Sequence, residues 1–247
     1  GVASEAALLT VQQIPVISSQ PLVQTICEGE DVTFTVVASG TGLTYQWQEN
    51  GVNITNGGVY SGAASATLTL SNVPSSFTGR NYRVNITGSC GPLSSAIVTL
   101  TVDRIPDALA TDASICSGQT TSIGITNPNA VTSTTFTWSV QSATNVTGAT
   151  AGSGNLIAQT LTSTDGVNSG TVTYLILPAA AGCVGTPYAV NVTVKPIPNV
   201  AASPQSICSG ANTSVAITNP NGVAGTSFSW IVFSSSNVSG AAAGSGT

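Results

Sequence analysis

The sequence contains no histidine and no methionine, and only 5% of its 247 residues are charged. Without histidine the commonest general base is missing, and no glycine-rich loop precedes a predicted helix, as phosphate binding would require. Binding to a nucleic-acid backbone needs clustered basic side chains. The four basic residues are instead scattered: Arg80, Arg83, Arg104 and Lys195. We therefore expect no enzyme, no catalytic residues, no resident cofactor and no nucleic-acid partner.

Long hydrophobic runs are also missing. No stretch approaches the roughly 18 apolar residues that indicate a membrane span, so no span is expected in these 247 residues. Because charged residues are scarce, we expect the solubility to come from Ser, Thr, Asn and Gly.

An Ile-Pro pair occurs three times, each after a Val/Thr-rich run that is typical of a last strand: Ile14-Pro15, Ile105-Pro106 and Ile197-Pro198. The spacings of 91 and 92 residues suit a β-sandwich domain and are too long for a solenoid repeat. The pattern predicts an all-β tandem array arranged as a rod. Its expected parts are the last strand of a preceding domain (1–15), complete domains at 16–106 and 107–198, and the first half of a further domain (199–247).

The first complete domain shows strand-like alternation, with Val32, Phe34 and Val36 on one face. Asn50-Gly51 predicts a tight hairpin, and Trp47 on the preceding strand is expected in the core. These features resemble the immunoglobulin fold, in which Tyr82 takes the tyrosine-corner position. The sequence departs from the antibody pattern, because Val36 and Val84 occupy the sites of the usual inter-sheet cysteines.

The five cysteines recur in step with the repeat. One pair per domain predicts the bridges Cys27–Cys90 and Cys116–Cys183, and leaves Cys208 to pair beyond Thr247, at about position 271 to 275. Such bridges indicate an oxidising, extracellular compartment. The alternative is a set of unpaired buried thiols in a cytosolic protein.

Motifs of the second domain recur in the segment that follows. Ser114-Ile115-Cys116-Ser117-Gly118 returns at 206–210, the Thr-Asn-Pro-Asn motif at 126–129 returns at 218–221, and Phe136-Thr137-Trp138 returns as Phe228-Ser229-Trp230. The alternating pattern places Trp138 and Trp230 in cores, as it does Trp47, rather than on a sugar-stacking platform.

This ordered series resembles the PKD-like and Ig-like repeats of giant cell-surface adhesins of Bacteroidota, of the SprB gliding-motility type. The resemblance covers 114–247 and implies a long filament exported by the type IX secretion system. It also implies the secretion and motility machinery as partners, a location on the bacterial cell surface, and adhesion to an external surface or polysaccharide through regions outside this segment.

An acidic cluster, Glu28, Glu30 and Asp31, precedes the first alternating strand. Carboxylate oxygens from a loop could hold Ca²⁺, which makes this the one candidate metal site. The competing interpretation is a solvated acidic turn, because the second domain has Ser117-Gly118-Gln119 at the same place.

Three functions remain open. The first is a structural spacer stalk of an adhesin. The second is a set of carbohydrate- or protein-binding modules, with loops 53–61 and 148–155 as the contact surface. The third is an accessory region of a secreted enzyme whose catalytic domain lies elsewhere.

Overall fold

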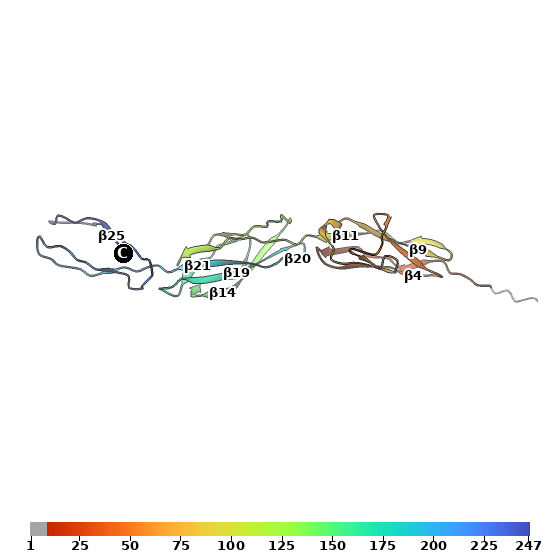
Figure 1. Ribbon diagram of the computed structural model, residues 1–247, viewed down its shortest axis with the longest axis horizontal. Helices are drawn as coiled ribbons and strands as arrows, with labels where there is room; N and C mark the ends of the chain where they lie inside the picture. Colours follow the sequence, from red (N-terminus) through yellow and green to blue (C-terminus); the bar gives the residue numbers. More distant parts are fainter. Residues whose placement is uncertain (1–8) are drawn as a thin grey trace, which may run out of the picture. The chain divides into compact units, whose positions relative to one another are not determined.

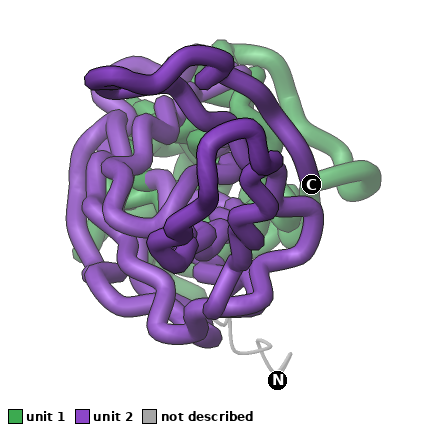
Figure 2. The backbone as a smooth tube through the Cα atoms, turned by 90° about the vertical axis from the view of Figure 1, so that its left-hand side faces the viewer, with its two compact units in different colours: residues 1–106, 179–184 green, residues 107–178, 185–247 purple. Residues whose placement is uncertain are grey.

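The computed structural model describes residues 9–247, and β-strands are its dominant regular element (Figure 1). The predicted all-β fold class is confirmed. Residues 1–8 lie outside the described part, so the strand expected near the start of the chain is covered only from Leu9 onward, where no strand is present up to Pro15. The chain divides into two compact units, which are described separately (Figure 2).

The first unit comprises the described residues up to Pro106, together with Ala179–Val184. Its main sheet has the order β2-β11-β9-β5-β6, with β10 paired to β9, and the sheet β3-β8-β7 and the pair β1-β4 complete the fold. The elements are β1 Val16–Ser19, β2 Gln24–Cys27, β3 Val32–Thr35, β4 Val37–Ser39, β5 Thr44–Glu49, β6 Val52–Asn53, β7 Tyr60–Ser61, β8 Thr67–Leu70, the 3-10 helix η1 Ser75–Phe77, β9 Asn81–Gly88, β10 Gly91–Ser94 and β11 Val98–Asp103.

The predicted hairpin at Asn50-Gly51 is confirmed. Both residues have positive φ, 48° and 85°, as a two-residue type I′ turn requires, and they join β5 to β6. This turn ends β5 immediately after Glu49, so the side chain of Glu49 lies at the edge of the core.

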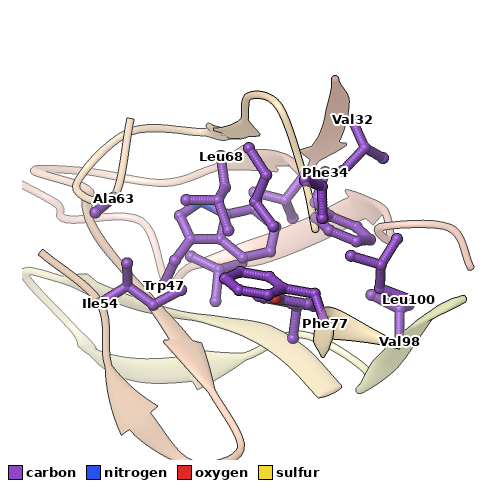
Figure 3. Packing of buried hydrophobic residues seen from close by; sticks show 14 of the residues in the cluster. Val32, Phe34, Trp47, Ile54, Ala63, Leu68, Phe77, Val98 and Leu100 are labelled. Carbon is purple, nitrogen blue, oxygen red and sulfur yellow. The ribbon is translucent and has the colours of Figure 1, made fainter. Parts of the chain in front are cut away.

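The core of the first unit lies between these sheets (Figure 3). Trp47 and Tyr82 are fully buried, and the ring of Tyr82 stacks on Phe34 at 4.9 Å between centroids. Val36 and Val84 are also buried, which confirms that valines fill the place of the antibody cysteines. The predicted alternation holds along β3 and β9, where every second side chain is buried. Strand β5 departs from it, because Trp47 and its neighbour Gln48 are both buried.

The second unit comprises 107–178 and 185–247, and its main sheet repeats the strand order of the first as β12-β21-β19-β14-β16. The pairs β13-β17 and β15-β18 face it, and β22-β23 and β24-β25 follow. The elements from Asp107 onward are β12 Ala113–Cys116, β13 Ile123–Gly124, β14 Thr135–Thr144, β15 Val146–Thr147, β16 Gly152–Ser153, β17 Leu156–Ile157, β18 Thr162–Ser163, β19 Gly170–Ala180, β20 Cys183–Val184, β21 Tyr188–Lys195, β22 Ala201–Ala202, β23 Ile217–Thr218, β24 Phe228–Trp230 and β25 Gly244–Gly246. Of these, β20 and the last two residues of β19 belong to the first unit.

Trp138 lies in the core of the second unit, as predicted, with 7% of its surface exposed. The same prediction for Trp230 is wrong, because this side chain is 42% exposed. Within the described residues, strands β19 and β21 continue the sheet beside the strand of Trp138, whereas Trp230 lies in the two-stranded sheet β24-β25.

Candidate functional site

A disulfide joins Cys27 to Cys183, which have a sequence separation of 156 and a distance of 5.6 Å between their Cα atoms. The predicted pairs Cys27–Cys90 and Cys116–Cys183 are therefore wrong. Cys27 is the last residue of β2, which runs parallel to β11, and Cys27 itself lies beside Asp103. Cys90 lies in the turn after β9, and the antiparallel register Thr99↔Asn81 places this turn at the far end of the sheet, roughly 35 Å away.

The pairing of β12, β21 and β19 separates Cys116 from Cys183 in the same way. Cys116 lies beside Lys195 at one end of β21, and Cys183 follows the far end of β19. A disulfide needs Cα atoms about 4.4–6.8 Å apart, so neither within-domain bridge can form without unfolding the sheet. Matching the cysteines by sequence spacing alone missed that the two members of each pair lie at opposite ends.

The disulfide lies between a turn and a hairpin tip, both in the first unit. The tip is the two-residue turn Ala181-Gly182, with φ of 50° and 86°, and it presents Cys183, which is 1% exposed. On the opposite side, the backbone N–H of Cys27 donates to Glu30 Oε2 at 2.9 Å. This hydrogen bond holds the turn of Cys27, and the pairing of Cys183 with Ala180 holds the hairpin.

The acidic cluster is dispersed over separate partners. Glu28 Oε1 accepts from the hydroxyl of Ser75 at 2.9 Å, Glu30 caps the Cys27 turn, and Asp31 Oδ1 accepts from the N–H of Asn72 at 2.7 Å. Within the described residues, no three His, Cys, Asp or Glu side chains gather as a metal ion would require. These contacts give the carboxylates a structural role, and calcium binding there stays an untested prediction.

A polar cluster surrounds Glu49 and contains the salt bridge between Arg80 and Glu49. The hydroxyl of Tyr82 donates to Glu49 Oε2 at 2.7 Å, the hydroxyl of Tyr60 donates to the same oxygen, and Arg80 Nη1 pairs with Oε1 at 2.7 Å. The guanidinium of Arg80 also lies 3.5 Å above the ring of Phe77, a cation–π contact.

Tyr82, which was expected at the tyrosine-corner position, is buried, and its hydroxyl binds the side chain of Glu49 on β5. Sequence reasoning did not single out Glu49. The one signal in the sequence was its place directly before the Asn-Gly turn; that Glu49 lies opposite Tyr82 is known only from the pairing of β5 with β9.

The two loops expected to bind ligands differ. Residues 53–57 and Tyr60, with Glu49, line an open hollow of about 440 Å³. The loop 148–155 instead covers Trp138: the indole N–H donates to the carbonyl of Thr150 at 3.2 Å, and the ring lies where any side chain at Gly152 would clash, 2.5 Å from an added Cβ. Of these two loops, the first is the one that lines this hollow.

The tyrosines of this cluster predict an alkaline loss of stability. Burial, followed by the hydrogen bond to Glu49, raises the pKa of both Tyr60 and Tyr82 above the ordinary value of 10.0. A raised pKa means that the folded state holds the proton more tightly than the unfolded state. The free energy of unfolding contributed by these tyrosines is therefore complete below about pH 10 and is lost as the pH rises further. In urea unfolding at pH 9 and above, we expect Tyr82→Phe to show a shallower decline than the parent chain.

The matched control for this titration is Tyr45→Phe, which removes a hydroxyl outside the Glu49 cluster. We expect it to retain the steep decline above pH 10. An equally steep decline of the unfolding free energy in Tyr82→Phe would show that the cluster does not cause the loss of stability at high pH.

Cys90, Cys116 and Cys208 are unpaired and exposed in the structure. Among the described residues, no helix is long and apolar enough to cross a membrane. The predicted partner of Cys208 lies beyond Thr247, so that pairing is not tested.

Comparison with known proteins separates the chain into two regions. Residues 113–198 match the PKD-like domain family, and residues 18–104 match a domain of unknown function, DUF8696. Endoglucanase C of Cellulomonas fimi is 36% identical over 105 residues, which are 42% of this chain and 9% of that protein. The chain thus spans about a tenth of the curated relative that it matches.

Solved structures with a similar arrangement include Rst D1-D2, at 15% identity, a TM-score of 0.45, and coverage of 74% of this chain and 99% of that one. The titin domains z1z2 in complex with telethonin are 17% identical, with a TM-score of 0.37 and coverage of 77% and 100%. The N-terminal Ig1-2 module of Drosophila DLAR is 18% identical, with a TM-score of 0.32 and coverage of 73% and 98%. By its own strands and sheets the chain is an all-β tandem of sandwich domains, and one of these domains is similar to the PKD-like family.

Proposed function

We propose that this chain is a non-catalytic spacer segment of an extracellular adhesin filament, built from modules at 16–106, 107–198 and 199–247. The observation that carries the proposal is the Cys27–Cys183 disulfide. It joins the region that matches DUF8696 to the region that matches the PKD-like family, so two sandwich modules share one covalent constraint.

The constraint matters when the chain is pulled. The 156-residue separation encloses strands β3 to β19, which include most of both hydrophobic cores. Tension along the chain enters at Cys27 and leaves at Cys183 through the disulfide, so the enclosed strands carry none of it. A stalk that holds a binding tip away from a surface needs this resistance to extension.

The extracellular location is supported by the disulfide, because such bonds persist in oxidising compartments. Attachment to the bacterial cell surface, export by the type IX system and a part in gliding motility follow from the sequence resemblance and are proposed on that basis alone. Adhesion itself is assigned to regions outside these residues.

A second candidate function is supported by the likeness to endoglucanase C, whose matched part is 9% of that protein. Under this alternative the modules accompany a catalytic domain of a secreted polysaccharide-degrading enzyme. The hollow beside Glu49 would then be the place for a sugar to bind, since it offers a carboxylate and the exposed part of Tyr60.

A binding experiment separates the two functions. The purified chain is incubated with insoluble cellulose, chitin and xylan, and with polystyrene, and the bound fraction is measured against serum albumin. A spacer shows no binding above the albumin level and releases no reducing sugar from carboxymethylcellulose. Saturable binding to one glycan, abolished in Tyr60→Ala and retained in Tyr45→Ala, would overturn the spacer proposal in favour of the alternative.

A further inference from the structure

We propose that the Cys27–Cys183 disulfide is one instance of a recurring joint between modules. Each joint has two halves, a cysteine at the end of a strand in one module and a cysteine in a hairpin of the next. Cys90, Cys116 and Cys208 are halves of further joints of this kind. Each exposed thiol would bond to the complementary half on a further copy of the module in the same polypeptide. This goes beyond a spacer function, because it specifies how successive modules are linked covalently.

Cys27 and Cys116 occupy the same place in their sheets. Each ends a strand that runs parallel to the last strand of its domain, beside Asp103 and Lys195 respectively. The N–H of the next residue donates to the carbonyl of that neighbour at 2.8 Å in both cases. Cys116 is therefore a strand-end half whose position is identical to that of a cysteine with a disulfide in the structure.

The capping of the two turns is also identical. The N–H of Cys27 donates to Glu30 Oε2 and the N–H of Cys116 to Gln119 Oε1, both at 2.9 Å. Gly29 and Gly118, two residues after each cysteine, have φ of 85° and 82°. The same backbone therefore presents both sulfur atoms, although one turn is acidic and the other neutral.

Cys208 belongs to the same class. Gly210 has φ of 84°, and the N–H of Ala211 donates to the carbonyl of Cys208 at 3.1 Å, as the N–H of Gln119 does to Cys116. The amide of Asn219 donates to its loop at 2.9 and 2.8 Å, and the amide of Asn127 makes the corresponding pair of bonds at 2.7 and 2.8 Å. The repeated sequence therefore folds as a repeated structure around this cysteine.

Cys90 is the hairpin half. It lies in the two-residue turn between Gly88 and Gly91, which are paired in β9 and β10. Cys183 occupies the equivalent hairpin, where it pairs with Ala180. The two cysteines differ by one position at the tip, and both hairpins extend from the strand that neighbours the last strand of the domain.

These halves cannot join within one copy, because the strand end and the hairpin tip lie at opposite ends of the sheet. The structure shows instead that a strand end bonds to the hairpin of the copy that follows in sequence. By the same rule Cys116 requires the hairpin of the next copy, Cys208 that of the one after, and Cys90 the strand end of a preceding copy. All three exposed thiols are thus assigned to one kind of joint.

Formation of each joint is an oxidation of two thiols. A disulfide oxidant, such as oxidised glutathione, accepts the two electrons and is reduced to two thiols, while the two cysteine sulfur atoms form one bond and their protons pass to the reduced oxidant. The proposal therefore requires an oxidising compartment and no further cofactor.

The test completes the copy that begins after Pro198. A second copy of residues 156–198, marked by mass with Thr186→Ser, is appended to Thr247, and the chain is refolded with oxidised and reduced glutathione. After alkylation, peptic peptides are mapped without reduction. We expect the peptide of Cys116 to be linked to the hairpin cysteine of the appended segment, with Cys90 and Cys208 alkylated and two free thiols per chain.

Matched variants make the result decisive. In the extended chain, Cys116→Ser should free the appended cysteine and give three free thiols, whereas Cys208→Ser should leave the new disulfide intact. A link from Cys208 to the appended cysteine, or an unlinked Cys116, would overturn the proposal. Burial of Trp230, read from a blue shift of its emission, reports that the appended segment has folded.

A second lengthened chain is used if the appended segment fails to fold and Trp230 stays exposed. An intact copy of 107–198, with the same mass mark, is inserted after Pro198. Here too, Cys116 should be linked to the hairpin cysteine of the inserted copy. Failure of the link in this chain overturns the joint without bearing on the spacer function, which the glycan-binding experiment tests separately.

Discussion

Reduction of the Cys27–Cys183 disulfide lengthens the chain under force by about 500 Å, at roughly 3.3–3.6 Å for each extended residue. The reason is the 156-residue separation that the bond closes: while it is intact, unfolding of the enclosed strands adds no length. The measurement is single-molecule extension between the two ends of the chain, with and without a thiol reductant. Cys27→Ser should give the long extension in either condition.

The matched control for the extension is Cys90→Ser, which removes an exposed and unpaired cysteine. It should leave both the short and the long extension unchanged. If the parent chain showed the full length before reduction, the disulfide would not carry the load and the spacer proposal would lose its main support.

Replacement of Glu49 by alanine destabilises the first unit by about 2–4 kcal/mol, because it leaves the buried hydroxyl of Tyr82 without an acceptor and Arg80 without its partner. Most of this loss belongs to Tyr82, since the Arg80 and Glu49 side chains are 29% and 19% exposed and water screens their attraction. The free energy of unfolding in urea measures the effect.

Two further variants test whether the loss in Glu49→Ala comes from the cluster. Glu49→Gln keeps an acceptor for the tyrosine hydroxyls and loses only the charge, so its loss should be about half as large or less. Asp107→Ala removes an exposed carboxylate and should stay within about 0.5 kcal/mol of the parent chain. A loss in Glu49→Ala no larger than in Asp107→Ala would show that the cluster does not stabilise the fold.

Local pattern predicted much of the fold. The alternation through Val32, Phe34 and Val36 indicated which face is buried, and Asn50-Gly51 indicated a hairpin, because each signal depends on residues close together in sequence. Trp47 and Trp138 were recognised as core residues for the same reason. Trp230 follows the same local pattern and yet is exposed, because burial depends on strands distant in sequence.

The site depended on pairing between distant strands, which no local pattern contains. Glu49 meets Tyr82 only when β5 and β9 align in register, and the acidic residues 28, 30 and 31 separate only when the loops around them close. Neither relation follows from spacing along the chain.

The sequence by itself determined that this protein is a tandem of β-sandwich modules with one recurring pair of cysteine positions, because periodicity and composition are properties of the chain. Only the tertiary structure decided which cysteines meet. The antiparallel course of β9 carries Cys90 to the end of the sheet remote from Cys27, and the parallel pairing of β2 with β11 leaves Cys27 beside the exit of its domain, where the hairpin of Cys183 reaches it.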